Sequence, residues 1–450
     1  MSYGGLSLAL VVVLGVAMHA TRGGDSAGWI LLVTAAFALW LRQSRCDFAH
    51  GPQRIDGSLL PFVGIAGAFF GALVVVHPAL LHAVHPRMLL GAQVATAVSA
   101  ACFALAARNT PRSRPALLAA AVALTLAHVL IPFASPHPII DVFTSNTAGA
   151  DHLLAGRNPY SQTYDDIYRG HYDYPPGIPY FPATLEWMAP FRGLLGDIRY
   201  GLLASTVLSA LALAWATSRA GRVTLLPPAL GALWLAFPVS LFVLEQSWVD
   251  PILAMATGVM AVALQSRRYV LAGLLLGFAC AVKQPALLIA VPTLAWVLGA
   301  GGKRAGAMMV GGAFVAFALL VGPLLATEPE GFLRMTLRVP LSQAARDSFT
   351  LVSLGAQIGI GGAARVGALI AAAATIAIAA FAFVQGRRRQ RLADWANLVF
   401  ATHVFAFLFG KQAFCNYYAL AAYFLLLAIG LGTEPASIGG VSEPMASSIG

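Results

Sequence analysis

The chain has 450 residues, of which 59% are hydrophobic and 10% are charged, and its formal net charge is +10. Water-soluble domains carry about a quarter charged residues. A soluble fold of this composition would expose large apolar surfaces, so the composition excludes an ordinary soluble domain and predicts a multipass membrane protein.

Apolar runs of roughly membrane length follow one another along most of the chain. They lie near residues 4–20, 27–42, 57–77, 87–107, 115–134, 200–217, 223–244, 249–265, 269–283, 285–301, 305–326, 366–385, 393–410 and 414–432. We therefore predict an all-α polytopic protein with about 14 transmembrane helices. The first run lacks a basic segment before it and is followed directly by another, so we expect a retained helix rather than a signal peptide.

Basic residues occupy every second loop between these runs. The basic loops contain Arg42, Arg45, Arg54, Arg108, Arg112, Arg114, Arg219, Arg222, Arg267, Arg268, Lys303, Arg304, Arg387, Arg388, Arg389 and Arg391, which are 16 of the 28 basic residues. By the positive-inside rule these loops are cytoplasmic, and both termini then lie on the same side. The positive charge is thus a topology signal in a plasma-membrane protein, and we expect no nucleic-acid partner.

The remaining loops fall on the extracytoplasmic side and divide the chain. We expect N-terminal transmembrane helices in residues 1–134, an extracytoplasmic loop in 135–198 and further transmembrane helices in 199–326. A second extracytoplasmic loop is predicted in 327–365, C-terminal transmembrane helices in 366–432, and a cytoplasmic tail in 433–450. The tail is rich in Ser and Gly, which is typical of disorder.

The loop 135–198 is the most polar part of the chain, with seven of the 18 carboxylates and six of the 12 tyrosines. Residues 143–155 have the pattern of a short amphipathic helix on the membrane surface, ended by Gly156. Tyr160, Tyr164, Tyr168 and Tyr172 recur every fourth residue, as on one face of a helix. The run YDYPPGIPYFP at 172–182 predicts a rigid extended segment.

Asp141 stands at the outer end of the fifth run, where a carboxylate is partly removed from water. Such a group suits a general base, which must lie near its substrate and accept a proton. The alternative is a carboxylate that reaches water at a helix end or caps the helix beginning near Thr144. Position alone favours the alternative.

Lys283 interrupts an apolar run just before Gln284-Pro285. An ionisable residue at membrane depth costs several kcal/mol unless it is paired, so it is a functional candidate. Lys283 is the best single cation for a phosphate at the lipid–water boundary, although a lysine can also snorkel at a helix end. Arg334 and Arg338, four residues apart on a predicted helix, are a candidate second phosphate clamp.

Other chemistries find little support. Asp165 and Asp166 could bind a divalent metal, but a solvated loop that caps a helix explains such a pair more often. His77, His82 and His85 fit no standard metal spacing. The chain has no GxxxxGK[ST] and no GxGxxG after a strand, so nucleotide hydrolysis is not expected. We predict no metal site and no cofactor.

Two stretches resemble a known family. The first stretch resembles the polyprenyl-phosphate-mannose-dependent mannosyltransferases of the GT-C glycosyltransferase superfamily. It consists of Asp141, then DHLLAGRNPY, and then YDYPP before the next apolar run. EQSWVDPILAMATGVMAVALQSRRYVLAGLLLGFACAVKQPALLIAVP at 245–292 resembles the family's glutamine-containing turn, basic turn and K-x-P motif. In the family pattern the catalytic Asp follows the first helix, whereas here about five runs precede Asp141. Asp25, in the first outer loop, is a rival, but it lacks the G-x-x-P-Y and YPP context.

The resemblance implies inverting transfer of mannose or another hexose or pentose from a polyprenyl-phosphate donor to a lipid-linked or cell-envelope glycan or glycolipid. Asp141 would deprotonate the acceptor hydroxyl on the extracytoplasmic face of the lipid bilayer. Lys283, Arg334, Arg338 or Lys411 would stabilise charge on the leaving phosphate. Residues that could bind sugar and acceptor hydroxyls are Asp151, Asn158, Tyr160, Tyr174, Glu245, Gln246 and Gln284.

Two other function classes stay open. A transporter or flippase of lipid-linked saccharides would place ionisable residues near the bilayer midplane, in broken helices. Here the polar residues concentrate on one face, which favours an enzyme. A structural or assembly subunit would use the outer loop as a docking surface. The sequence also leaves open whether Asp141 or Asp151 is the base.

Overall fold

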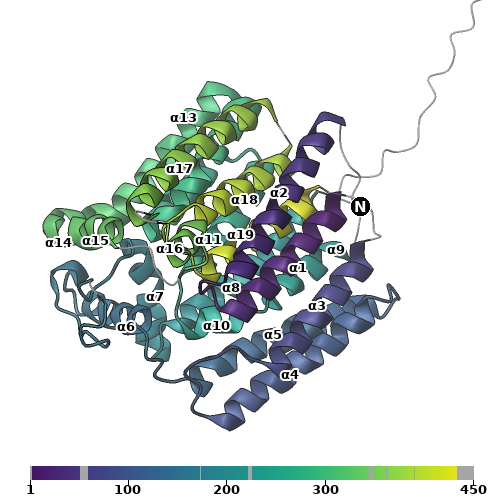
Figure 1. Cartoon of the computed structure of the whole chain (residues 1–450), viewed down its shortest axis with the longest axis horizontal. Helices are drawn as coiled ribbons and strands as arrows, with labels where there is room; N and C mark the ends of the chain where they lie inside the picture. The colour runs from purple at the N-terminus through teal and green to yellow at the C-terminus, as the bar shows by residue number, and fades with distance from the viewer. Residues whose placement is uncertain are drawn as a thin grey trace, which may run out of the picture.

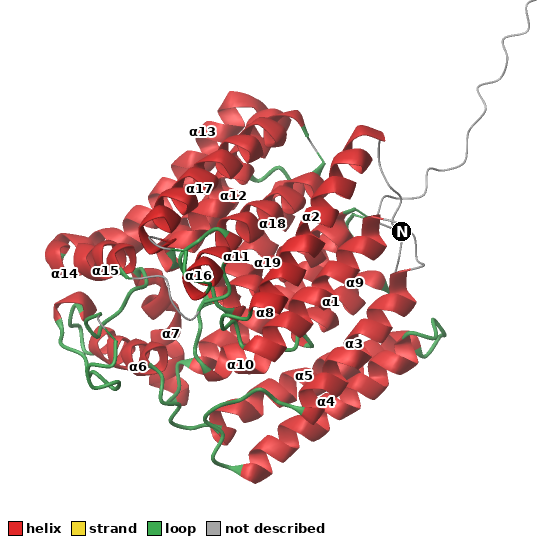
Figure 2. Ribbon diagram, in the orientation of Figure 1, coloured by secondary structure: helices red, strands yellow, loops and turns green. Residues whose placement is uncertain are grey.

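The computed structural model describes residues 3–50, 59–172, 174–220, 225–343, 348–360, 363–389 and 391–432. Within these ranges every regular element is helical, and most helices run side by side in one bundle (Figure 1, Figure 2). The predicted tail 433–450, together with Arg54 and Arg222, lies outside the described residues.

Five helices precede the loop 135–198, and all are long and apolar enough to cross a membrane. They are α1 (Tyr3–Thr21), α2 (Ala27–His50, of which Ala27–Ser44 is the apolar part), α3 (Leu59–Val76), α4 (Pro86–Ala106) and α5 (Ser113–Ala134). Their bounds follow the predicted runs closely. The exception is α2, which continues past residue 42 because no Gly or Pro interrupts the polar residues that follow.

The second half of the bundle contains longer and shorter apolar helices. They are α8 (Arg199–Ser218), α9 (Leu226–Leu235), α10 (Ser240–Glu245), α11 (Asp250–Gln265), α12 (Tyr269–Val282), α13 (Leu287–Thr327), α17 (Ala363–Arg388), α18 (Leu392–Leu408) and α19 (Cys415–Leu431). In the described part of the chain seven helical segments are both long and apolar enough to cross a membrane, the last being Gln284–Thr327. The protein is therefore an all-α polytopic membrane protein, while the number of 14 spans stays a prediction.

One predicted run is divided in the structure, and one helix of the structure spans the two predicted runs 285–301 and 305–326. The run 223–244 is divided into α9 and α10, with Pro238 between them, because proline lacks the N–H that a continuous helix needs. The helix α13 turns back at Gly302, whose φ is +74°. A Cβ built on Gly306 would lie 2.6 Å from Leu298, a contact that residues about 12 Å apart along a straight helix cannot make.

Small residues bring α12 close to the second half of α13. A Cβ on Gly273 would lie 2.0 Å from the carbonyl oxygen of Met309, and one on Gly277 would lie 2.2 Å from that of Ala313. Glycines four residues apart permit such close helix contacts in membrane proteins. This packing holds the end of α12, where Lys283 follows.

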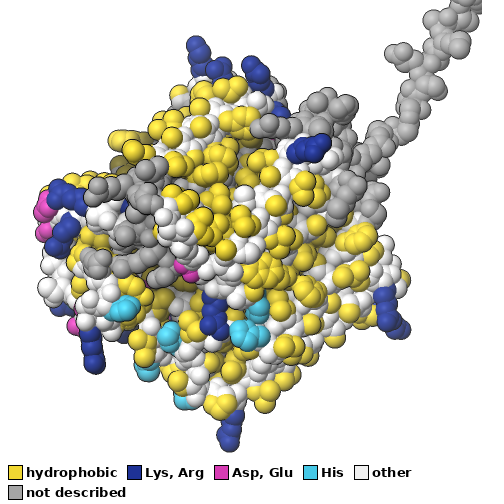
Figure 3. Space-filling model, in the orientation of Figure 1, with side chains coloured by type: hydrophobic (Ala, Val, Ile, Leu, Met, Phe, Trp, Pro, Cys, Tyr) yellow, Lys and Arg dark blue, Asp and Glu magenta, His cyan; other side chains and the backbone are white. Residues whose placement is uncertain are grey.

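The two predicted outer loops contain short helices. Loop 135–198 holds α6 (Asp141–Leu154), the 3-10 turn η1 (Pro159–Ser161) and α7 (Pro182–Leu195), and loop 327–365 holds α14 (Pro329–Leu333), the π-helical η3 (Arg334–Arg338), α15 (Val339–Ser342) and α16 (Leu351–Gln357). In Figure 1, α6, α7, α14 and α15 gather at one end of the bundle, and the N-terminus lies at the other. Large apolar side chains are exposed along the helices, as expected where they face lipid (Figure 3).

The tyrosines at every fourth position do not form a helix face. Residues 162–172 contain no helix, and the left-handed Arg169 (φ +52°) and Gly170 (φ +79°) form a turn there. The spacing was therefore misleading for the segment after η1, because local turn geometry overrides a four-residue repeat.

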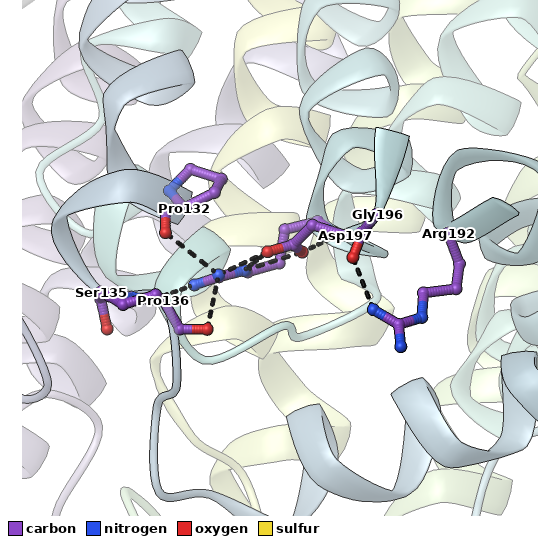
Figure 4. A network of polar contacts seen from close by, with 7 residues as sticks. Pro132, Ser135, Pro136, Arg192, Gly196 and Asp197 are labelled. Carbon is purple, nitrogen blue, oxygen red and sulfur yellow. Dashed lines mark hydrogen bonds and ion pairs between the residues drawn. The ribbon is translucent and has the colours of Figure 1, made fainter. Parts of the chain in front are cut away.

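Arg199 closes the loop 135–198 at its base. Its side chain is fully buried and pairs with Asp197, with 2.6 Å between Nη2 and Oδ2. It also donates to the carbonyl oxygen of Ser135, and the carbonyl oxygens of Pro132 and Pro136 lie 3.5 Å from Nη2 (Figure 4 labels these three residues). The same guanidinium lies 4.8 Å from the ring of Phe143. One buried cation thus joins the end of α5 and the start of α8 to α6, which begins with Asp141.

Candidate active site

A cavity of about 370 Å³ lies where the two outer loops meet the ends of the bundle helices. The described residues of its wall come from segments that lie far apart in the sequence. The polar and aromatic residues in this wall are Asp141, Asp165, Asp166, Tyr168, Tyr172, Tyr174, Tyr180, Trp248, Lys283, Gln284, Gln343, Gln412, Phe414, Asn416 and Tyr417. Four of the predicted site residues are therefore in one place: Asp141, Tyr174, Lys283 and Gln284.

Asp141 is the first residue of α6 and is half-buried. Its Oδ2 accepts a hydrogen bond of 2.7 Å from the hydroxyl of Tyr174, and its Oδ1 lies 2.8 Å from the backbone nitrogen of Val142. Its own backbone N–H donates to the hydroxyl oxygen of Tyr168 at 3.3 Å. A carboxylate held in this way keeps lone pairs that can accept a substrate proton.

Three tyrosines stand beside this carboxylate. The rings of Tyr168 and Tyr172 meet edge to face at 4.8 Å, and those of Tyr172 and Tyr174 stack at 5.5 Å. Burial, with the nearby negative charge of Asp141, raises the pKa of Tyr168 to about 12. The same causes raise the pKa of Tyr174. Both hydroxyls are therefore protonated hydrogen-bond donors at physiological pH.

Lys283 is the one basic residue that the described wall contains, and it is 3% exposed. Its Nζ lies 3.2 and 3.1 Å from the two carboxylate oxygens of Asp250, which is equally buried. The ammonium also sits 4.0 Å from the ring centre of Tyr417. The lysine is thus held in place by a buried ion pair and a cation–π contact.

Gln284 connects the walls of the cavity. Its Nε2 donates to the backbone oxygens of Pro179 at 2.9 Å and Thr336 at 2.6 Å. These carbonyls belong to the proline-rich run and to η3, so the side chain joins both outer loops to the turn after α12.

Other predicted residues in loop 135–198 lie outside the wall. Asp151 accepts two hydrogen bonds from Arg192, at 2.8 and 3.0 Å. Asn158 donates to Leu324 and Thr327 at the end of α13. The buried hydroxyl of Tyr160 donates to the backbone oxygen of Tyr180 at 2.7 Å. These contacts hold the loop against the bundle.

Glu245 and Gln246 also lie away from the cavity wall. The fully buried carboxylate of Glu245 accepts hydrogen bonds from the backbone nitrogens of Leu81 and His82, at 2.8 and 2.9 Å. The side chain of Gln246 donates to the same carboxylate. Their contacts join the 245–250 turn to the α3–α4 connection.

The remaining predicted cations are near the rim or on the surface. Arg338 pairs with Glu330, and both side chains are largely exposed. Arg334 is exposed and does not line the cavity. The Nζ of Lys411 donates to the carbonyl oxygens of Leu341 and Gln343. Gln343 and Gln412, beside these contacts, do line the cavity, so Lys411 lies close to its rim.

Sequence reasoning passed over several wall residues. Trp248 of the wall and Asp250, which pairs with the wall residue Lys283, belong to the EQSWVDP turn, where the predictions had selected Glu245 and Gln246 instead. Asn416 and Tyr417 belong to the GKQAFCNYY stretch, from which only Lys411 had been selected. The available signal was a cluster of polar and aromatic residues in short turns on the predicted outer face.

Comparison with known families places much of the chain in a described family. The family model described as glycosyltransferase family 87 matches residues 172–410, which is more than half of the 450 residues. The matched region contains Tyr174, Asp250 and Lys283 of the site, whereas Asp141 and Asn416 lie outside it. No curated protein and no solved structure matches this chain.

Proposed function

The chain belongs to glycosyltransferase family 87 and is a membrane glycosyltransferase, and we propose that its donor is a polyprenyl-phosphate sugar. The acceptor is a hydroxyl of a lipid-linked or cell-envelope glycan, and transfer inverts the anomeric centre. One observation carries the proposal: a carboxylate oriented by a tyrosine hydroxyl, Asp141, shares a cavity with a buried lysine, Lys283.

Asp141 acts as the general base. The acceptor hydroxyl approaches a carboxylate lone pair that neither Tyr174 nor Val142 uses. As the acceptor oxygen bonds to the anomeric carbon, its proton passes to Asp141, and the bond from that carbon to the phosphate oxygen breaks. The electron pair leaves with the phosphate, on the face opposite to attack, which gives inversion.

Lys283 stabilises the charge that grows on the leaving phosphate. An ammonium group has three N–H donors, and Asp250 takes two of them. The ammonium also faces the ring of Tyr417, and these contacts hold the lysine in position before substrate arrives. A preoriented cation in a water-poor site stabilises developing charge better than a mobile surface cation. Lys411, with Arg334 and Arg338, attracts the anionic donor to the rim.

The site operates on the extracytoplasmic face of the plasma membrane, with both termini in the cytoplasm. The alternation of basic loops supports this orientation. The polyprenyl chain of the donor stays in the bilayer, while its phosphate and sugar reach the cavity at the bundle end. The candidate sugars are mannose, which the resembling enzymes transfer, and also arabinose, glucose and galactose.

The direct test measures sugar transfer by Asp141→Asn. Purified protein is supplied with labelled polyprenyl-phosphate mannose, glucose, galactose or arabinose and with acceptors from membrane extracts. The wild type should transfer one of these sugars, and Asp141→Asn should lower kcat by roughly a thousandfold while keeping the wild-type elution profile.

Asp25→Asn is the matched control, because Asp25 is the rival base in the first outer loop. It should transfer at the wild-type rate. Wild-type-like transfer by Asp141→Asn would exclude Asp141 as the base. No transfer by the wild type from any donor would argue for the transporter alternative.

A further inference from the structure

Asn416, at the start of α19, is held beside the Lys283–Asp250 pair. It is 2% exposed and lies in the wall of the cavity. Its Nδ2 donates a short hydrogen bond to Oδ2 of Asp250. An ionised carboxylate only accepts hydrogen bonds, so the amide nitrogen must face Asp250. The orientation of the side chain is therefore determined by chemistry, and Oδ1 points away from the carboxylate.

This Oδ1 atom is buried and has no hydrogen-bond partner in the described part of the protein. Buried polar atoms are nearly always paired, because leaving an acceptor unpaired costs about 1–3 kcal/mol. The ammonium of Lys283 does not donate to it, since that group is directed at Asp250 and the ring of Tyr417. The atom is an unused acceptor on a side chain that lines the cavity and contacts the Lys283–Asp250 pair, where the donor phosphate is proposed to lie.

The surroundings of this acceptor suit a neutral, hydroxyl-rich group. The charges of Lys283 and Asp250 compensate each other. The aromatic side chains of Trp248, Phe414 and Tyr417 line the same cavity as Asn416. The rings of Trp248 and Phe414 stack at 6.3 Å. Amphipathic rings with a few oriented polar groups are typical of pockets that bind a ligand such as a sugar.

A phosphate cannot satisfy this atom. The phosphodiester of a polyprenyl-phosphate sugar has acceptor oxygens and no O–H group, so it would repel Oδ1. A sugar hydroxyl is a donor and pairs with it directly. We propose that Asn416 Oδ1 accepts a hydrogen bond from one hydroxyl of the transferred sugar, so that Asn416 determines which sugar the enzyme accepts. This inference rests on the proposed function and adds a specificity residue to it.

The experiment combines the removal of single hydroxyls from the donor sugar with the removal of the Asn416 amide from the enzyme. The donor that the wild type uses is prepared with each ring hydroxyl removed in turn, and kcat/KM is measured for each analogue. In the wild type, one deoxy analogue should lose roughly tenfold because it leaves Oδ1 unpaired. In Asn416→Ala this penalty should fall to about twofold or less, while the penalties at the other positions persist.

This pattern separates sugar recognition from support of Asp250. A merely structural role would lower kcat/KM by one common factor for all analogues. If Asn416→Ala does not fold, Asn416→Ser serves, because it keeps a hydrogen-bond donor at this position but lacks the amide oxygen. The control is Asn397→Ala, a buried asparagine of α18 that accepts from Tyr3, and it should keep the wild-type penalties.

Two results would overturn the inference. If each deoxy analogue lost the same factor of kcat/KM in the wild type and in Asn416→Ala, Oδ1 would not accept a hydrogen bond from a sugar hydroxyl. It would then be served by water from the smaller cavity of about 20 Å³ that Asn416 also lines. A wild type without transfer from any donor would remove the proposed function and this inference together, so the two failures are distinguishable.

Discussion

Asp141 and Asp151, the two candidates for the base, differ in their partners. Asp151 gives both carboxylate oxygens to Arg192, at 2.8 and 3.0 Å, and lies outside the cavity wall. Asp141 lies in the wall, and its side-chain partner is the neutral hydroxyl of Tyr174. A bidentate guanidinium pair leaves little room for a substrate hydroxyl. This difference supports Asp141 as the base.

The hydroxyl of Tyr174 is predicted to orient the carboxylate of Asp141. Tyr174→Phe should lower kcat by roughly ten- to a hundredfold, because a hydrogen bond to a charged group contributes about 1.5–3 kcal/mol. The measurement is the sugar-transfer rate at saturating donor.

Tyr164→Phe is the control for Tyr174→Phe. Its hydroxyl also donates to a partner, the carbonyl of Pro159, but the residue does not line the cavity. It should keep the wild-type rate. Equal losses in both variants would mean that the hydroxyls act only through loop stability.

Between elements, the Lys283–Asp250 pair joins the end of α12 to the start of α11. Neither side chain is more than 4% exposed. Removing one partner of a buried pair leaves an uncompensated charge, which destabilises a protein by about 3–5 kcal/mol. We therefore expect Asp250→Asn and Lys283→Met each to lower the thermal unfolding midpoint in detergent by several degrees.

The double variant Lys283→Met/Asp250→Asn separates stability from catalysis. It contains no uncompensated charge, so its midpoint should recover by more than half of the single-variant losses. Transfer should stay lost, because the phosphate has no cation. A double variant that regains full transfer would contradict the role of Lys283.

Glu186 on α7 is predicted to make stability depend on pH. Burial raises its pKa from 4.5 to about 7, and its Oε2 has no partner among the described residues. The folded state therefore favours the protonated carboxyl group. Its contribution to the free energy of unfolding is fully present below pH 4.5 and is lost as the pH rises through about 7. The loss amounts to at most about 3 kcal/mol.

Glu186→Gln should flatten this dependence. Between pH 5 and 8 the thermal midpoint of the wild type should fall, and that of the variant should change much less. The control is Glu330→Gln, because Glu330 is 68% exposed in its pair with Arg338. A variant with the wild-type slope would show that another group titrates.

For the whole molecule, the central prediction is sidedness. A single cysteine replacing Arg157 in the outer loop should react on intact cells with a membrane-impermeant maleimide. One replacing Lys303, at the turn within α13, should react only after permeabilisation. Both positions are exposed, and the background lacks Cys46, Cys102, Cys280 and Cys415 while keeping sugar transfer. The opposite labelling pattern would invert the proposed topology.

The sequence predicted the helical runs well because their signal is local. A long apolar segment is visible in the chain itself, and a helix satisfies its backbone hydrogen bonds internally. Finer features were missed where proline or glycine acts inside or beside a run, as at Pro238 and after η1. Asp141 and Lys283 were identifiable because a charge next to an apolar run needs an explanation.

By itself, the sequence determined the membrane class, the helical segments and a short set of polar candidates. Only the tertiary structure decided which candidates meet. Tyr174 contacts Asp141 across 33 residues, Asp250 contacts Lys283 across 33, and Asn416 contacts Asp250 across 166. No local pattern encodes such pairs, because they depend on how whole helices pack. That packing gave Asp151 and Glu245 structural partners, and it placed Asp141, Lys283 and Asn416 around one cavity.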